Sequence, residues 1–336
     1  MKILIIGGTG FIGPFVAKKL LELGHEVTVF HRGSSLVELP AEIHHIYGDR
    51  RHLIDLKKEL QDYGPTVVLD MISFFEADAK MVQQVLSSIA DRFVVISSQD
   101  VYLAYGRLTG FEPGPILPGP VTEKSPLRQK LFPYRGQIQT MHDYDKILVE
   151  KVVLSNQGFP GTVLRLPMVY GPGDKQHRLF SYLKRMDDGR PAIMLEEKFS
   201  QWCWTSGYVE NVAAAIVLAV VDERACNNIY NVGQDNTLSM GEWVRKIGTI
   251  AGWNGKIITQ PSERLPEHLS MDINAAQHLV ADTTKIRQEL GYTETISLEQ
   301  GLRRTINWER SSPPANLDPK LFNYEAEDNL LAELGV

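Results

Sequence analysis

His142, Tyr144 and Lys146 stand two residues apart in TMHDYDKILVEK, a stretch that can carry proton-transfer chemistry. If the stretch is helical, residues four apart share a face, because each residue turns the helix by about 100°. His142 then lies over Lys146, and Tyr144 points to the other side. An imidazole has a pKa of about 6.5 in model peptides, and its neutral form can accept a proton from a substrate hydroxyl. The spacing therefore places an imidazole, which is capable of general acid/base work, on the same face as the lysine.

A glycine cluster, GGTGFIG, follows directly after the first apolar run and precedes an amphipathic helical pattern. Its glycines fit both G-x-G-x-x-G and G-x-x-G-x-x-G. Glycines at this spacing let the chain turn tightly and let a pyrophosphate approach the amides at a helix N-terminus, where side chains would block it. The strand–turn–helix context supports a dinucleotide-binding turn. The residues predicted to contact the cofactor here are Gly7, Gly10, Phe11, Ile12 and Gly13.

The end of the second apolar run, VTVFHRGSS, bears on the choice of dinucleotide. An NAD site usually presents a carboxylate to the ribose hydroxyl about 20 residues after the glycines. This chain instead presents groups that can hold a 2′-phosphate, namely His31, Arg32, Ser34 and Ser35. We therefore predict NADP, with NAD as the alternative. Downstream, Asp49 can accept a hydrogen bond from the adenine amino group, and Arg50 beside it is included in the predicted site.

Short β-branched runs alternate with amphipathic segments through the first half of the chain. Alternation of this kind predicts an α/β fold with a doubly wound parallel sheet, whose ligands lie beyond the carboxyl ends of the strands. The predicted strands are Lys2–Ile6, Glu26–Phe30, Ile43–Tyr47, Thr66–Asp70, Phe93–Ser97, Thr162–Leu166 and Asn228–Val232. The predicted helices are Phe11–Leu23, Ala77–Ala90, Met141–Asn156 and Val209–Val221.

The organisation beyond this core is less regular. Residues 103–137 are rich in Pro and Gly without periodicity, and loops of such length are usually lids or binding loops, the alternative being a surface insertion. We predict a nucleotide-binding domain at 1–170 plus 205–232 and a substrate-binding lobe at 171–204 plus 233–310. Residues 311–336 are predicted to be a tail without an assigned function.

Composition excludes several classes of protein. The chain has 336 residues, 43% of them hydrophobic and 23% charged, as in ordinary globular proteins. No apolar run approaches the roughly 20 residues of a membrane helix, and a net charge of −6 disfavours nucleic-acid binding. Two cysteines give no disulfide framework and favour a reducing, cytoplasmic location. The three histidines His44, His45 and His52 lack acidic or thiol neighbours, so we predict no metal.

Taken together, the motifs resemble the extended short-chain dehydrogenase/reductase family in its NAD(P)-dependent epimerase and dehydratase branch. The resemblance runs from Met1 to about Trp308 and is carried by GGTGFIG, VVISSQDVY, KILVE, LRLPMVYGPGD, YVENVAAAI and VADTTKIRQELGY. It implies a Rossmann domain with a smaller C-terminal substrate lobe, a hydride-transfer site between them, and a homodimer.

The resemblance also assigns roles to particular positions. Ser98 corresponds to the residue that orients the substrate hydroxyl, Lys146 to the lysine that holds the nicotinamide ribose, and Pro167 to a cofactor contact. The family's acid/base is a tyrosine four residues before that lysine, and this chain has His142 there, with Tyr144 displaced by two. The resemblance thus implies acid/base chemistry by His142, with Tyr144 as the alternative if the helix starts late.

Two departures bear on the substrate. Nucleotide-sugar relatives hold the substrate diphosphate with an arginine where this chain has Trp204, and with another where LSMDINAAQHLVAD contains none. The main hypothesis is an epimerase, dehydratase or reductase-like enzyme, an oxidoreductase in its chemistry, acting on a small, hydroxyl-bearing, sugar-like substrate. The alternatives are a catalytically degenerate NADP-binding sensor or binding protein, and an RNA-binding relative such as the chloroplast stem-loop-binding proteins.

Overall fold

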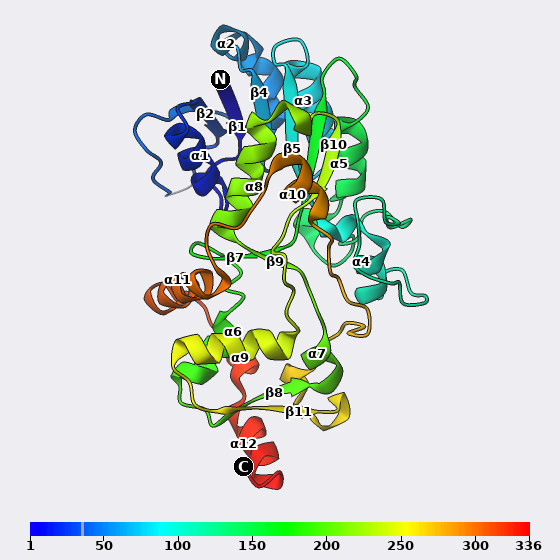
Figure 1. Cartoon of the computed structure of the whole chain (residues 1–336), viewed down its shortest axis with the longest axis vertical. Coiled ribbons are helices and arrows are strands. Elements are labelled where there is room, and N and C mark those ends of the chain that lie inside the picture. The colour runs from blue at the N-terminus through cyan, green and yellow to red at the C-terminus, as the bar shows by residue number, and fades with distance from the viewer. Residues whose placement is uncertain (35–36) are drawn as a thin grey trace.

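The computed structural model describes residues 1–34 and 37–336, which form a seven-stranded parallel sheet flanked by helices (Figure 1). The strand order is β10-β6-β5-β4-β1-β2-β3, so the chain starts in the middle of the sheet and winds outwards in both directions. This is the predicted doubly wound Rossmann arrangement. The strands are β1 (Lys2–Ile6), β2 (Glu26–His31), β3 (His44–Tyr47), β4 (Val67–Asp70), β5 (Arg92–Ser98), β6 (Gly161–Leu166) and β10 (Asn228–Asn231).

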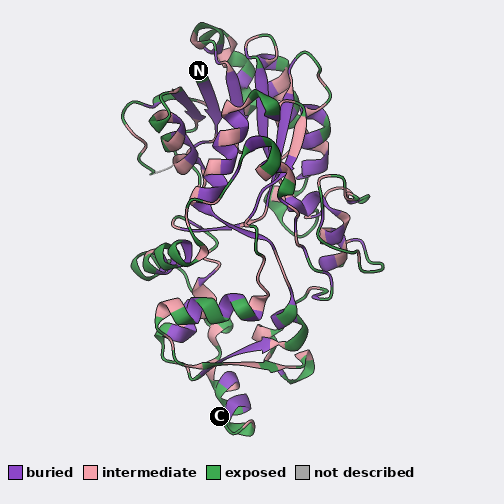
Figure 2. Ribbon diagram, viewed as in Figure 1, coloured by how far each residue is buried: buried purple, intermediate pink, exposed green. Residues whose placement is uncertain are grey.

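Both faces of the sheet are buried, as Figure 2 shows for its central strands. Side chains alternate along a strand, so Ile3 and Ile5 point to one face while Leu4 and Ile6 point to the other. Helices α1 (Gly13–Glu22) and α8 (Val209–Val221) cover the first face. Helices α2 (Lys57–Tyr63), α3 (Glu76–Leu86) and α5 (Lys146–Val153) cover the second. The near-continuous apolar strands follow from this double cover.

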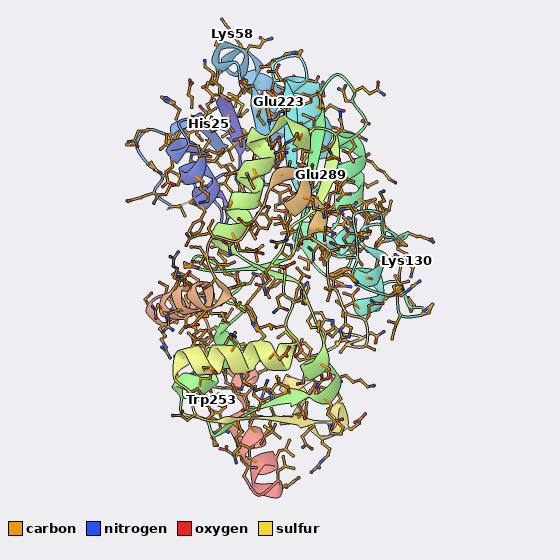
Figure 3. All side chains as sticks on the ribbon, in the orientation of Figure 1. His25, Lys58, Lys130, Glu223, Trp253 and Glu289 are labelled. Atoms are coloured by element: carbon orange, nitrogen blue, oxygen red, sulfur yellow. The ribbon has the colours of Figure 1, made fainter. Side chains whose placement is uncertain are left out.

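A smaller lobe lies below the sheet in Figure 1, joined to it through the paired strands β7 (Met168–Tyr170) and β9 (Ser206–Tyr208). It is built around two parallel strands, β8 (Ala192–Glu196) and β11 (Lys256–Gln260). Its helices are α6 (Phe180–Asp187), α7 (Glu197–Gln201), α9 (Met240–Ala251) and α11 (Leu298–Ser311). Trp253, labelled in Figure 3, belongs to this lobe and donates its indole N–H to the Arg190 carbonyl.

Helix α10 (Thr284–Leu290) returns to the large sheet although the predicted lobe range includes it. The Lys285 ammonium donates to the Asn228 side chain and to the Ile229 carbonyl of β10. Glu289, labelled in Figure 3, accepts a hydrogen bond from the Tyr230 hydroxyl. The segment therefore closes the edge of the sheet.

The C-terminal tail is docked on the smaller lobe. Leu330 and Leu331 of α12 (Tyr324–Glu333) are buried in a cluster with β8 and Leu265. Glu327 lies 2.6 Å from the Arg185 guanidinium, and this ion pair is almost fully buried. The tail thus contributes to the core of the lobe.

Residues 103–137 are tied to the rest of the protein at several points. They begin with α4 (Leu103–Leu108), a short helix that the sequence did not predict. Gln277 exchanges two hydrogen bonds with the Leu117 backbone, and the buried Arg128 donates to the Asp100 carbonyl at the end of β5. Lys130, labelled at the right of Figure 3, donates to the Phe111 carbonyl within the same segment. These contacts hold the segment beside the carboxyl end of β5.

Candidate functional site

A cavity of about 680 Å³ lies at the carboxyl ends of β1, β2, β3 and β4. This is the position at which doubly wound sheets bind their ligands, and the volume suits a small-molecule site. Its walls include the predicted cofactor residues Gly7, Gly10, His31, Arg32, Asp49 and Arg50. Ser34 also lines the cavity, whereas Ser35 lies outside the described residues.

The glycine turn provides room for a ligand at one position and close packing at others. Gly7 has a φ of 86°, in the left-handed region, and a Cβ there would lie 2.7 Å from the Ile72 side chain. A Cβ on Gly13 would come within 2.4 Å of a backbone oxygen of the turn. On Gly10 it would meet no described atom within 4 Å, so the space beside this backbone is open. The turn therefore fits a pyrophosphate at the N-terminus of α1.

Several other predicted cofactor residues lie around the turn. Phe11 and Ile12 are half-buried next to the start of α1, and a Cβ on Gly173 would lie 3.5 Å from the Phe11 ring. Pro167 follows β6 and packs near Gly207. Phe11, Ile12, Gly13 and Pro167 thus lie in the turn or at the carboxyl edge of the sheet.

The end of β2 presents nitrogen donors to the cavity. His31 Nε2 lies 2.8 Å from His45 Nδ1, and burial together with His45 lowers the pKa of His31. Arg32 is exposed, and no carboxylate of the described residues lies within ion-pair distance of it. The end of this strand is therefore suited to an anionic ligand group.

The next corner of the cavity has paired charges. The Asp49 carboxylate accepts hydrogen bonds from the Arg51 amide and guanidinium, which hold the pKa of Asp49 well below its usual range. Arg50 forms a two-pronged ion pair with Asp70, and its Nε lies 3.1 Å from Asp78. Asp70 and Asp78 were not predicted, although Asp70 ends a buried strand, which is the position where polar residues face a ligand edge.

The predicted stacking of His142 over Lys146 is wrong, because the helix begins at Lys146 and not at Met141. Asp145 caps it by accepting a hydrogen bond from the Ile147 amide, and the backbone of Asp145 is extended. Residues four apart share a face only within a helix. The His142 side chain is 60% exposed, and its Nδ1 lies 3.0 Å from the Asp143 carboxylate.

The late start brings Tyr144 into the interior instead. Its hydroxyl donates to Asp100 Oδ2 at 2.8 Å, and the Ser98 side chain lies close enough to the phenol to influence its pKa. Burial and the Asp100 carboxylate raise the pKa of Tyr144 well above its usual range. The phenol is therefore neutral at ordinary pH and can donate a proton.

Lys146 lies beside this phenol. Its ammonium donates to the Ser73 carbonyl at 2.7 Å and the Ile96 carbonyl at 2.8 Å, and it lies 5.9 Å from the centre of the Tyr144 ring. Burial lowers the pKa of Lys146 to about 8. Phe74, whose ring centre is 4.9 Å from the ammonium, also lines the cavity. Phe74 therefore borders both this cluster and the dinucleotide cavity.

Asp100 is the main residue of the site that the sequence analysis missed. It follows Ser98 at the carboxyl end of β5, and the Ser98 hydroxyl accepts a hydrogen bond from its amide. It is 5% exposed, and burial raises its pKa. An acidic residue immediately after a buried central strand was the available indication.

The cavity, the glycine turn and the sheet define a dinucleotide-binding protein of the doubly wound class. The sequence model of the NAD dependent epimerase/dehydratase family matches residues 3–233, and the chain belongs to that family. The predicted family and fold are confirmed. Its relatives include NAD-dependent enzymes, and the reaction of this chain must be inferred from its own residues.

Two curated relatives span most of the chain. Chloroplast stem-loop binding protein of 41 kDa b from Arabidopsis thaliana is 26% identical over 328 residues, which cover 91% of this chain and 78% of that protein. UDP-N-acetyl-alpha-D-glucosaminuronate decarboxylase from Bacillus cytotoxicus is 25% identical over 334 residues, covering 91% of this chain and 97% of that enzyme.

A solved structure supports the fold. UDP-glucuronic acid 4-epimerase from Bacillus cereus, in complex with UDP-glucuronic acid and NAD, gives a TM-score of 0.70 at 21% identity. The match covers 93% of this chain and 99% of that one. Within the described ranges of our structure, no helix is both long and apolar enough to cross a membrane, and no group of three or more His, Cys, Asp or Glu residues is arranged to hold a metal ion.

Proposed function

We propose that this chain is an NAD(P)-dependent enzyme that interconverts a hydroxyl and a carbonyl group on a sugar-like substrate. The observation that carries the proposal is the convergence of Tyr144, Lys146 and Asp100 beside Phe74, which lines the dinucleotide cavity. The bound cofactor supplies the hydride acceptor or donor. The chain holds the cofactor, orients the substrate and moves the proton.

Each group of the cluster has a role that suits its environment. Tyr144 gives its proton to the forming alkoxide, or takes one from the substrate hydroxyl while passing its own to Asp100. Ser98, whose side chain lies near the same phenol, orients the substrate hydroxyl. Lys146 holds the nicotinamide ribose with its ammonium. His142 is exposed beside Asp143 and does not share a helical face with Lys146, so we assign it no role in proton transfer.

For the cofactor we propose NADP in preference to NAD. Arg32, His31 and Ser34 line the cavity at the end of β2, where a carboxylate that would bind a ribose hydroxyl is absent from the described residues. Asp49, an acidic residue of the cavity wall, is held by Arg51. A 2′-phosphate would meet an exposed guanidinium there.

For the substrate we propose a sugar-like molecule bound without an arginine clamp on a diphosphate. Trp204 stands where nucleotide-sugar relatives would carry the first arginine, and its buried indole N–H has no hydrogen-bond partner among the described residues. Its ring centre lies 5.2 Å from that of Trp202. Lys175, which lines the cavity, remains available to a smaller anionic group.

The test has two stages. Native mass spectrometry of the protein as purified, with titration of NAD and NADP, shows which dinucleotide binds. Turnover is then followed by nicotinamide absorbance with UDP-glucose, UDP-glucuronic acid, dTDP-glucose and the corresponding free sugars. Reduction or oxidation of at least one probe is expected. Tight cofactor binding without turnover of any probe would contradict the enzyme proposal and favour a sensor, and salt-sensitive RNA binding would favour the RNA-binding alternative.

We also propose a cytoplasmic homodimer. Free Cys203 and Cys226 are compatible with a reducing compartment, and the dimer follows from the family resemblance. Light scattering of the purified protein measures the assembly, and a monomeric mass would contradict the dimer.

A further inference from the structure

Three phenols and one carboxylate form a continuous hydrogen-bonded chain beside the site. The hydroxyls of Tyr144 and Tyr134 both donate to Asp100 Oδ2, at 2.8 and 3.2 Å. The hydroxyl oxygens of Tyr134 and Tyr105 lie 2.9 Å apart. Because Tyr134 donates inward to Asp100, its oxygen is free to accept the proton of Tyr105.

This series of hydrogen bonds runs from the interior of the protein towards solvent. Tyr144 and Asp100 are buried, with 6% and 5% of their surface exposed, whereas Tyr134 and Tyr105 are partly exposed. The two outer tyrosines belong to the 103–137 segment, Tyr105 through helix α4. The segment that covers the site thus also supplies the outer links.

The carboxylate in the middle of this hydrogen-bonded series, that of Asp100, can take up a proton. Asp100 Oδ1 is buried and has no hydrogen-bond partner among the described residues. The nearest guanidinium nitrogen, Nη2 of Arg128, is 4.0 Å from Asp100 Oδ1 and 3.5 Å from Asp145 Oδ1. The positive charge of Arg128 is therefore divided between the two carboxylates. Burial raises the pKa of Asp100, so the protonated form is within reach during a reaction.

We propose that Tyr144, Asp100, Tyr134 and Tyr105 form a path that carries the reaction proton between the buried site and solvent. The proposal rests on the proposed function, in which Tyr144 exchanges a proton with the substrate.

The steps balance in atoms and charge. In oxidation, bound NAD(P) would take up the hydride from the substrate C–H bond, and the substrate O–H proton moves to the Tyr144 oxygen. The Tyr144 proton moves to Asp100. The hydroxyls of Tyr134 and Tyr105 then rotate outward, so that Tyr134 accepts from Asp100 and donates to Tyr105. Asp100 returns to its charged form by giving its proton to the Tyr134 oxygen as Tyr134 passes its own to Tyr105, which releases one to water. Reduction runs the same steps in reverse.

Such a path matters most when the net reaction is redox. An epimerase returns the proton to its substrate within one turnover, so it needs no exchange with solvent. A net dehydrogenase or reductase releases or takes up one proton each cycle. A path to solvent therefore favours net oxidation or reduction in this chain. The titratable groups that face Asp100 are Arg128, Lys146, Tyr105, Tyr134 and Tyr144.

The test measures proton exchange without any substrate. In protein labelled with ¹³C at tyrosine Cζ, the isotope shift after transfer into D₂O reports how fast the Tyr144 hydroxyl exchanges, and Tyr144→Phe assigns the signal. Tyr134→Phe and Tyr105→Phe should each slow this exchange about tenfold or more, because exchange must then wait for local opening. Tyr105→Phe leaves both donors to Asp100 in place, so its effect separates a path from a structural hydrogen bond.

Tyr170→Phe is the matched control, since its buried hydroxyl has no partner among the described residues and lies outside the chain of phenols. It should leave the exchange of Tyr144 unchanged. Equal or faster exchange in Tyr134→Phe and Tyr105→Phe would overturn the path. Loss of the enzyme proposal shows up separately, as absent turnover in the wild type or as turnover unaffected by Tyr144→Phe.

Discussion

Tyr144→Phe and His142→Phe together decide which residue moves the proton. Tyr144→Phe removes only the hydroxyl that donates to Asp100 at 2.8 Å. General acid/base groups contribute about 10²–10⁴ to a rate, which corresponds to about 3–5 kcal/mol of barrier. Turnover should fall by that factor while cofactor affinity stays nearly unchanged. His142→Phe alters a side chain that is 60% exposed, and we expect turnover to stay within about threefold of the wild type.

Tyr144→Phe also has a calculable effect on stability. A hydrogen bond to a charged group contributes about 1.5–3 kcal/mol, and Asp100 keeps the Tyr134 donor when Tyr144 loses its hydroxyl. The unfolding entropy of 336 residues is about 0.7 kcal/mol/K, so Tm should fall by about 2–4 °C. This fall is too small to explain a hundredfold loss of turnover at ambient temperature.

The assay follows the single-turnover redox change of the bound nicotinamide with an active probe, alongside thermal unfolding by circular dichroism. Tyr170→Phe, the same chemical change at a buried hydroxyl without a partner among the described residues, is the control and should retain full turnover. Retained activity in Tyr144→Phe together with loss in His142→Phe would refute the reasoning and restore the histidine.

Four further predictions follow from the structure. Arg32→Ala should weaken NADP about tenfold or more by calorimetry with little effect on NAD, because it removes a charge-assisted contact to the 2′-phosphate; equal losses for both would contradict the NADP preference. Gly10→Ala should block cofactor binding at an unchanged Tm, since its Cβ enters open space, whereas Gly13→Ala should lower Tm because its Cβ would lie 2.4 Å from a backbone oxygen. The pKa of Lys146, about 8 in the folded protein, lies below its unfolded value of 10.5, so the unfolded state binds more protons between these pH values and stability rises with pH. In urea titrations the wild type should therefore gain about 3 kcal/mol relative to Lys146→Met from pH 8 to 10.5, and a constant difference would disprove the shift. Leu331→Ala should cost about 2–4 kcal/mol in the same titrations, because α12 docks through this buried side chain; no change would mean that the tail does not contribute to the core.

The sheet could be predicted from sequence because its determinants are local. The strand Lys2–Ile6 and the helix Val209–Val221, which covers the sheet, have the same bounds in the structure as in the prediction. Each is set by its own burial pattern and its flanking turns. The glycine turn was equally accessible, because its spacing reflects a steric need that only glycine meets.

The start of α5 could not be read in the same way, because it depends on contacts distant in sequence. Tyr144 forms an isolated β-bridge with Phe75, and the Phe132 amide donates to the Asp145 carboxylate. These contacts hold residues 144 and 145 out of the helix, and Asp145 then caps it. A helical pattern predicted to begin at Met141 reveals neither partner. The docking of α12 is of the same kind, because Glu327 finds Arg185 in a different part of the chain.

The displaced tyrosine reaches the site because extended chain covers more distance per residue than helix. Four helical residues advance about 6 Å, and two extended residues advance about 6.5 Å. Asp145 is extended and the helix begins at Lys146. The backbone of Tyr144, two positions before the lysine, therefore lies about as far from Lys146 along the chain axis as a residue four positions before it would lie in a continuous helix. The spacing that looks aberrant in the sequence thus still places the Tyr144 ring beside the Lys146 ammonium, 5.9 Å from ring centre to nitrogen. A spacing rule for this pair therefore holds only together with the position of the helix cap.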